Sequence, residues 1–342
     1  MNIYFLIFIF ITIYGIKFFK DGDKNYLDKK STTISRGFFT ILIFFSHFNS
    51  YFSNIEIQYP IYTKIIGKIG QLMVTMFLFY SGYGIYKSCI SKENYFKNFL
   101  KNRFLKTLFV FDLAVFMYLI VGVIKGNTYS SKQIILSFIG WDSLGNSNWF
   151  MFDILILYLI TYIIAKIFDN KLNKKAIISI TIVSLILIVG LHKYKQLWWY
   201  DTLLCYSIGM IYAFYENEIN KIFQSKYYLI ILILATILFG TTYILEKYSI
   251  LFNLINAIIF SLWYTIIMYK IKIGNNCLEF LGKYSYEIYI LQRIPDILCI
   301  KQESNPVIMF PVCLGITIIL SLLFKKFVGI VWNNKLIKEN KR

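Results

Sequence analysis

The chain has 342 residues, of which 58% are hydrophobic and 16% are charged, and its formal net charge is +18. Soluble domains carry about 25% charged residues, so this composition excludes an ordinary soluble domain and indicates an integral membrane protein. The five cysteines form no CxxC or Cys/His metal spacing, and we therefore predict neither a disulfide framework nor a metal site.

Apolar runs of about 20 residues, long enough to cross a bilayer as helices, recur along the whole chain. The first, at 2–19, lacks an early Lys or Arg and a small-residue cleavage site, so we expect a retained helix and not a signal peptide. Further runs lie at 37–53, 69–88, 107–124, 149–168, 176–191, 197–215, 227–245, 250–269, 280–298 and 306–330. The sequence therefore predicts an all-α, polytopic transmembrane helical bundle of about eleven spans. The run at 280–298 is the least regular, and Lys283 within it is a candidate partner of Glu287 at the i−4 position.

The distribution of basic residues predicts how the chain is oriented. With the N-terminus outside, the cytoplasmic connectors and tail hold 27 of the 36 Lys and Arg residues, and the external connectors hold 9. This bias follows the positive-inside rule, so we predict a multi-pass protein of the cell membrane with an external N-terminus and a cytoplasmic C-terminus. Because the basic charge marks orientation, we exclude nucleic acid as a partner.

The stretch RGFFTILIFFSHFNSY, at 36–51, places an arginine and a histidine in one apolar run. In a helix, the eleven residues from Arg36 to His47 make ~1100°, close to three full turns, with a rise of ~16 Å. Both cations then share one face, with Arg36 at the cytoplasmic surface and His47 near the middle of the bilayer. An ionisable group at that depth indicates a functional site. A histidine hydrogen-bonded to a neighbouring helix for packing is the alternative.

Trp149 and Asp153 stand at informative positions in the predicted run at 149–168. Asp153 lies four residues after Trp149, so both share one helix face near the outer end of a predicted span. For Asp153 the alternatives are a polar cavity and a structural salt bridge, and for Trp149 they are a substrate cavity and an interfacial anchor.

The connector at 92–106 is dense in positive charge, with Lys97, Lys101, Arg103 and Lys106. Arg103 and Lys106 are three residues apart and would share a helix face. Such a cluster suits a multiply phosphorylated cofactor, but it also suits a purely topogenic role with contacts to anionic lipid.

Four stretches carry a resemblance to a known family. They are the Arg36-to-His47 segment, FLFYSGYGIYKS at 77–88, NWFMFDILILYL at 148–159 and LGKYSYEIYILQ at 281–292. In order and spacing they resemble the motifs of the acyltransferase 3 family of integral membrane O-acyltransferases. Two positions depart from the family pattern: Gln292 replaces the usual histidine of the last motif, and Arg103 with Lys106 replaces an arginine pair. We predict no role for Gln292.

The resemblance implies transfer of an acyl group, usually acetyl, from cytoplasmic acyl-CoA to a hydroxyl of a cell-surface or lipid-linked glycan, or of a small molecule. Acyl-CoA would be a co-substrate, with no permanently bound cofactor. His47 would act as general base or covalent acyl relay, and Arg36 would neutralise cofactor charge or developing oxyanion charge. Coenzyme A phosphates would meet Arg103, Lys106 and Lys101. Candidates for the substrate cavity are Ser81, Tyr83 and Tyr286, together with Asp153 and Trp149.

The resemblance also implies a division of the chain. We expect an N-terminal span and cytoplasmic connector at 1–35, a ten-span membrane acyltransferase domain at 36–330 and a basic cytoplasmic tail at 331–342. The alternative class is a polytopic transporter or flippase without acyl transfer, although the sequence shows no inverted repeat of the kind many transporters have. The expected partners are membrane lipid, acyl-CoA and the hydroxyl acceptor, and a homo-oligomer stays open.

Overall fold

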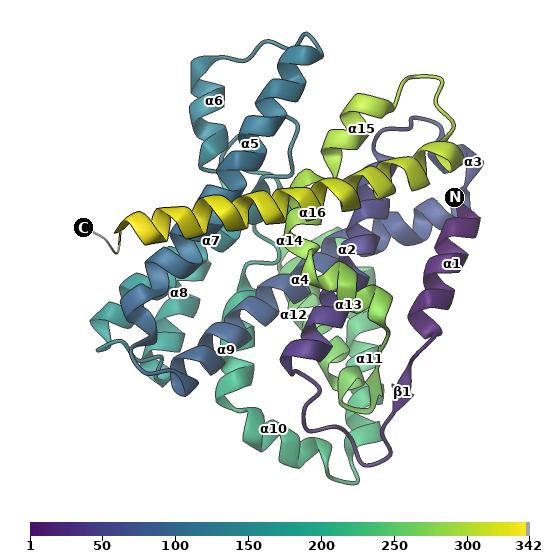
Figure 1. Ribbon diagram of the computed structural model, residues 1–342. Coiled ribbons are helices and arrows are strands. Elements are labelled where there is room, and N and C mark those ends of the chain that lie inside the picture. Colours follow the sequence, from purple (N-terminus) through teal and green to yellow (C-terminus); the bar gives the residue numbers. More distant parts are fainter. Residues whose placement is uncertain (340–342) are drawn as a thin grey trace.

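The computed structural model describes residues 1–339, except for the side chains of Lys68 and 333–339, so residues 340–342 of the predicted basic tail at 331–342 lie outside the described residues. Nearly all elements are helices (Figure 1). In chain order they are α1 (Asn2–Ile13), β1 (Lys17–Phe18), α2 (Lys29–Asn49), α3 (Ile55–Gln58), α4 (Pro60–Ser91), η1 (Tyr95–Asn98), η2 (Leu100–Leu105), α5 (Lys106–Ile124), α6 (Ser131–Phe138), α7 (Trp149–Ile167), α8 (Lys174–His192), η3 (Leu197–Trp199), α9 (Leu204–Phe214), α10 (Glu216–Phe223), α11 (Tyr228–Leu245), η4 (Glu246–Tyr248), α12 (Ile250–Lys270), β2 (Ile271–Lys272), α13 (Asn276–Lys283), α14 (Ser285–Leu291), α15 (Arg293–Cys299) and α16 (Pro306–Glu339).

Seven helical segments in the described part of the chain are long and apolar enough to cross a membrane. They are Pro60–Ser91, Leu100–Ile124, Trp149–Ile167, Lys174–His192, Tyr228–Tyr248, Ile250–Lys270 and Pro306–Trp332. Each coincides with a predicted run. The predicted class, an all-α polytopic protein, agrees with this structure, whereas the count of about eleven spans is not confirmed.

The other four predicted runs differ from a simple span for local reasons. At 2–19, α1 has 12 residues, or ~18 Å, against a hydrocarbon core of ~30 Å. The run at 37–53 falls in the 21-residue α2, whose polar first half lowers its hydropathy. At 197–215, α9 has only 11 residues. The run at 280–298 is divided among α13, α14 and α15.

Two residues explain the breaks in that last run. Tyr284 leaves the helical conformation (φ −115°, ψ 10°) and ends α13. Pro295 has no N–H to donate to the carbonyl four residues earlier, which interrupts the helix between α14 and α15. The predicted pairing of Lys283 with Glu287 is therefore wrong, because the two residues lie in different helices. Glu287 instead pairs with Lys325 at 3.3 Å.

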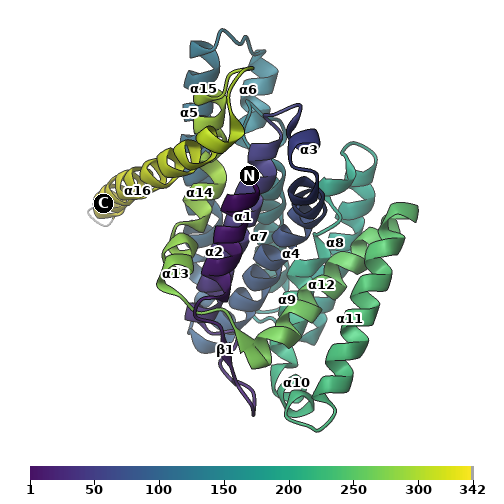
Figure 2. The ribbon, with the colours of Figure 1, turned by 90° about the vertical axis from the view of Figure 1, so that its right-hand side faces the viewer.

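Glycines allow two helix pairs to approach closely at the centre of the bundle. α2 packs against α4, and α4 against α9, while α11 and α12 form an outer pair (Figure 2). A Cβ at Gly82 of α4 would collide with the backbone of α9, and one at Gly209 of α9 would collide with α4. Gly37 of α2 and Gly282 of α13 make the same kind of reciprocal contact. Small residues let membrane helices pack backbone to backbone, and here they hold α2 and α4 in position.

A short two-stranded clasp ties the segment before α2 to the segment after α12. β1 and β2 are antiparallel, with Lys17 opposite Lys272. Asp23 forms an ion pair with Lys272 next to this clasp. The clasp holds the residues that lead into α2 at one end of the bundle (Figure 2).

Candidate active site

A cavity of about 1020 Å³ runs between α2, α4, η2, α7, α10 and α14. On α2 its lining extends from Asp28 to Ile43, which is ~22 Å of helix. Basic side chains line it near the start of α2 and the end of α4: Lys24, Lys29, Lys87 and Lys92. Apolar and aromatic side chains line it further along: Ile43, Val74, Phe77, Phe150, Ile154 and Tyr289. The cavity therefore has a basic end and an apolar end.

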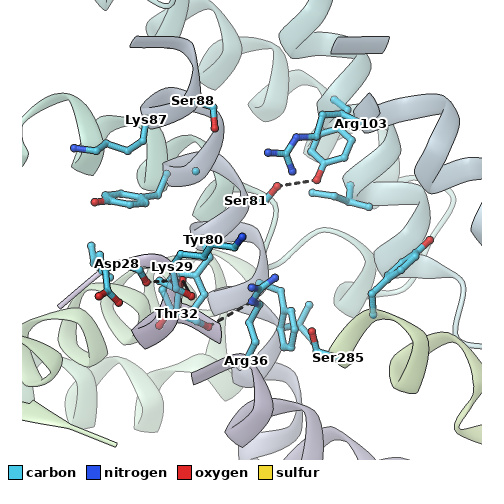
Figure 3. Close-up of a pocket in the computed structure, with 18 of the residues that line it drawn as sticks. Asp28, Lys29, Thr32, Arg36, Tyr80, Ser81, Lys87, Ser88, Arg103 and Ser285 are labelled. Carbon is cyan, nitrogen blue, oxygen red and sulfur yellow. Dashed lines mark hydrogen bonds between the residues drawn. The ribbon is translucent and has the colours of Figure 1, made fainter. Parts of the chain in front are cut away.

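Two arginines face this cavity from different elements. Arg36 stands two turns into α2, which begins where the Asp28 side chain accepts a hydrogen bond from the backbone N–H of Ser31. Its guanidinium donates to the Thr33 hydroxyl at 3.0 Å, and the Nε of Arg103 donates to the Tyr95 hydroxyl at 3.3 Å. Figure 3 shows the two guanidinium groups pointing into the same space.

Neither guanidinium has an acidic partner in the part of the chain whose side chains are described. Among the residues with described side chains, no carboxylate lies within ion-pairing distance of Arg36 or Arg103. Two half-buried cations without counter-ions form a site for an anionic ligand, because charge-assisted hydrogen bonds to phosphate or carboxylate would satisfy them.

Three other predicted cavity residues also line this space. The Ser81 hydroxyl lies 3.0 Å from that of Tyr158 (Figure 3), and the Tyr286 hydroxyl donates to the carbonyl of Thr107. The Tyr83 hydroxyl donates to a carboxylate oxygen of Glu216 at 2.7 Å. That carboxylate also pairs with Lys87 at 2.8 Å, so this lysine, unlike the arginines, is already neutralised. Sequence reasoning did not find Glu216, which lies in a short amphipathic helix without a motif.

The structure does not bring Lys101 or Lys106 into the lining of the cavity. Residues 100–105 form a π-helix, in which the N–H of Lys106 donates to the carbonyl of Lys101, five residues back. The wider turn removes the shared face that an α-helix would give Arg103 and Lys106. Lys106 is exposed, while Arg103 points into the cavity.

Trp149 and Asp153 also lie outside the lining of this cavity. Asp153 is fully buried, and neither carboxyl oxygen has a hydrogen-bond partner among the described residues. The salt bridge considered for it is not formed there. The ring of Trp149 instead packs edge-on against that of Phe150.

His47 lies one turn beyond the apolar end of the cavity. Ile43, four residues earlier on α2, lines the cavity, and His47 does not. The two rings of Tyr289 and His47 have centroids 6.2 Å apart, and Tyr289 belongs to the lining. The single helix α2 does carry both Arg36 and His47, as predicted. Of the predicted ~16 Å rise between them, the ~10 Å from Arg36 to Ile43 runs along the cavity, and His47 lies ~6 Å beyond it.

The surroundings of His47 contain polar groups for which the sequence predicted no role. Gln292 Nε2 lies 2.8 Å from His47 Nδ1, and the Ser147 hydroxyl lies 3.4 Å from the same nitrogen. Near them, Arg293 Nε and both carboxyl oxygens of Asp296 are buried without partners among the described residues. Each such group costs about 1–3 kcal/mol if left unsatisfied, so this region suits a ligand that can both donate and accept hydrogen bonds.

Metal ligation has no support in the described residues, where no three His, Cys, Asp or Glu side chains are grouped closely enough to hold an ion.

The comparison with protein families decides the identity of the fold. The model of the acyltransferase domain matches residues 29–326. The chain belongs to the acyltransferase 3 family. The match begins at the first residue of α2 and includes every residue of the cavity lining except four in the segment before it, Lys24, Asn25, Leu27 and Asp28.

As a member of the acyltransferase 3 family, the protein is a membrane acyltransferase. The resemblance seen in the sequence is thereby confirmed. No significant match was found among curated proteins or among solved structures.

Proposed function

We propose that this acyltransferase 3 protein transfers an acyl group, which we take to be acetyl, from cytoplasmic acyl-CoA to a hydroxyl of a cell-surface or lipid-linked glycan. The observation that carries the proposal is the cavity itself, with two arginines partway along it that have no acidic partner among the described residues, and with Tyr289 beside His47 at its apolar end. An extended pantetheine arm has a reach similar to the ~16 Å that separates Arg36 from His47 along α2.

The proposed binding mode follows from charge and shape. The phosphates of coenzyme A lie at the basic end, where Arg36 and Arg103 lack counter-ions. The pantetheine arm follows the apolar wall toward Tyr289. The thioester then comes close to His47 when the Tyr289 ring moves aside. Lys106, exposed and outside the lining, has no part in this arrangement.

Two routes of acyl transfer fit a histidine at this position. In direct transfer, an imidazole nitrogen takes the proton of the acceptor hydroxyl while its oxygen attacks the thioester carbonyl and the coenzyme A thiolate leaves. In a relay, the imidazole nitrogen attacks the thioester carbonyl first and the coenzyme A thiolate leaves. The acceptor hydroxyl then attacks the acyl-histidine, gives up its proton and takes the acyl group as the imidazole leaves. Acid quenching with labelled acyl-CoA in the absence of acceptor separates them, because only the relay leaves label on the protein.

The proposed orientation places the basic end of the cavity in the cytoplasm. Its lining comes from the segment before α2 and from the end of α4, both on the side that the charge distribution assigns to the cytoplasm. We propose the plasma membrane as the location, with the N-terminus outside and the C-terminus inside. Single cysteines introduced into the 92–98 segment and labelled with an impermeant reagent test this, and labelling from outside would overturn it.

The function is tested by two measurements on the same gene. The ester content of surface glycans should fall when the gene is deleted and return on complementation. The purified protein should transfer label from acetyl-CoA to glycan extracted from the deletion strain. No gene-dependent ester and no transfer in vitro would contradict the proposal. The transporter alternative has no observation in its favour now that the family is known.

A further inference from the structure

Among the described residues, Gln292 makes the closest polar contact to the imidazole of His47. Its Nε2 lies 2.8 Å from Nδ1 of the imidazole. Gln292 is 1% exposed and stands at the break between α14 and α15. The side chain is therefore held in place by its surroundings and cannot exchange this contact for water.

The orientation of the Gln292 amide follows from its second contact. Nε2 also donates to the carbonyl oxygen of Tyr289 at 3.2 Å. The opposite orientation would set Oε1 against this carbonyl, acceptor against acceptor, and would lose that hydrogen bond. The nitrogen, which only donates, therefore faces His47.

A donor at Nδ1 determines where the histidine keeps its proton. The Nδ1 lone pair accepts from Gln292, so the proton of the neutral ring is on Nε2. Nε2 itself has no hydrogen-bond partner among the described residues. We propose that Gln292 is a positioning residue that fixes the neutral tautomer of His47 with its proton on Nε2.

This tautomer changes what the histidine offers to a substrate. The free nitrogen presents an N–H, which can donate to a carbonyl oxygen such as that of a thioester. Accepting a proton at Nε2 instead requires the ring proton on Nδ1, and an acceptor to receive it. Gln292 Oε1, buried without a partner, becomes that acceptor when the amide turns over. The amide thus sets whether Nε2 acts as a donor or as a base.

The tautomer can be measured without turnover. The chain has two histidines, so protein labelled at both histidine ring nitrogens gives two sets of nitrogen NMR signals, and a His192→Gln variant assigns them. At a pH where the ring is neutral, we expect the His47 Nδ1 signal at the unprotonated position and the Nε2 signal at the protonated position. The reverse pattern in the wild-type protein would overturn the proposal.

Variants of Gln292 separate positioning from packing. Gln292→Glu replaces the donor by an acceptor of the same size, so the proton should move to Nδ1. Gln292→Leu removes both the amide donor and the amide acceptor, and should give a mixture of tautomers. Ser147→Ala, which removes only the longer contact of 3.4 Å, should leave the wild-type pattern. A wild-type pattern in both Gln292 variants would overturn the inference, even if they fold well.

The activity of these variants rests on the proposed function, whereas the NMR pattern does not. Gln292→Leu also removes the Oε1 acceptor that the ring needs, with its proton on Nδ1, for Nε2 to act as a base. In the acyl transfer assay it should therefore lower kcat by roughly 10²-fold, within the range that general acid–base catalysis contributes, with KM for acyl-CoA unchanged. A wild-type protein that shows the Nε2–H tautomer but no acyl transfer would refute the function and leave the inference standing. A wild-type protein that transfers acyl groups but carries its neutral ring proton on Nδ1 would refute the inference and leave the proposed function standing.

Discussion

Tyr289 lines the cavity, and its ring centroid lies 6.2 Å from that of His47. The ring also packs edge-on against Phe150, another residue of the lining, at 5.4 Å. Tyr289 therefore belongs to the apolar end of the cavity and also lies beside His47. In the proposed reaction, the thioester has to pass this ring to move from the cavity that binds the donor to His47, where the acyl group is transferred.

Enlarging the Tyr289 ring should obstruct that passage. Tyr289→Trp adds volume in a packed wall, at a cost of about 1–3 kcal/mol, so kcat should fall ~10-fold or more. The dissociation constant for acyl-CoA should stay close to wild type, because the phosphates bind at the other end. Tyr289→Phe, which removes a hydroxyl without a partner, is the matched control and should change kcat far less. Equal kcat in the Trp variant and wild type would rule out a gating role.

Arg103 and Lys106 form a matched pair of charges, one inside the cavity and one outside it. Arg103→Gln should raise the dissociation constant for acyl-CoA by roughly 10- to 150-fold, which corresponds to a charged hydrogen bond of about 1.5–3 kcal/mol. Lys106→Gln removes the same charge from the exposed position and should leave binding unchanged. Calorimetry or filter binding on the purified variants gives the comparison. An equal rise of the dissociation constant in both variants would mean that only the overall charge of the connector affects acyl-CoA binding.

The close approach of α4 and α9 predicts a difference between two glycines of one helix. A Cβ at Gly82 would collide with the Tyr206 backbone, whereas nothing lies within 4 Å of one at Gly67. Gly82→Ala should therefore destabilise the protein by about 1–3 kcal/mol, as overpacking does, and Gly67→Ala should not. Thermal unfolding in detergent measures both. A Gly82→Ala variant as stable as wild type would show that the helices can separate freely.

The clasp at the mouth of the cavity should respond to pH. Burial raises the pKa of Asp23, but the hydrogen bond and charge of Lys272 outweigh burial and hold that pKa below its usual value. A lowered pKa contributes stability above the ordinary carboxyl pKa of about 3.9, and this contribution is lost as pH falls through the lowered value. Asp23→Asn should thus lower Tm at neutral pH, with the difference vanishing in strong acid.

A double-mutant cycle provides the control for the clasp. Lys272→Met removes the same ion pair, so adding Asp23→Asn to it should cost little more. Full additivity of the two changes in Tm would show that Asp23 and Lys272 do not interact.

Much of the site could be predicted because its signals are local. The apolar run after Arg36 requires a helix, and that helix fixes the separation of Arg36 and His47. Ser81, Tyr83 and Tyr286 lie in motifs of the family, and all three line the cavity.

The remaining features depend on interactions that no short stretch reveals. A π-helical turn at 100–105 separates Arg103 from Lys106, although helical spacing would join them. The interruption at Gln292 follows from Pro295, but the contact of Gln292 with His47 joins residues 245 positions apart. The replacement of the motif's histidine by Gln292 was the one available hint of its place beside His47.

The central claim is that His47 carries the acyl transfer, and its removal is the most direct test. His47→Ala protein, purified and inserted like wild type, should bind acyl-CoA normally because its phosphates meet Arg36 and Arg103 in the cavity. Transfer of label from acetyl-CoA to glycan acceptor should fall by at least ~10²-fold, the lower end of what a general base contributes. Near-normal transfer by His47→Ala would contradict the account and return this histidine to a packing role.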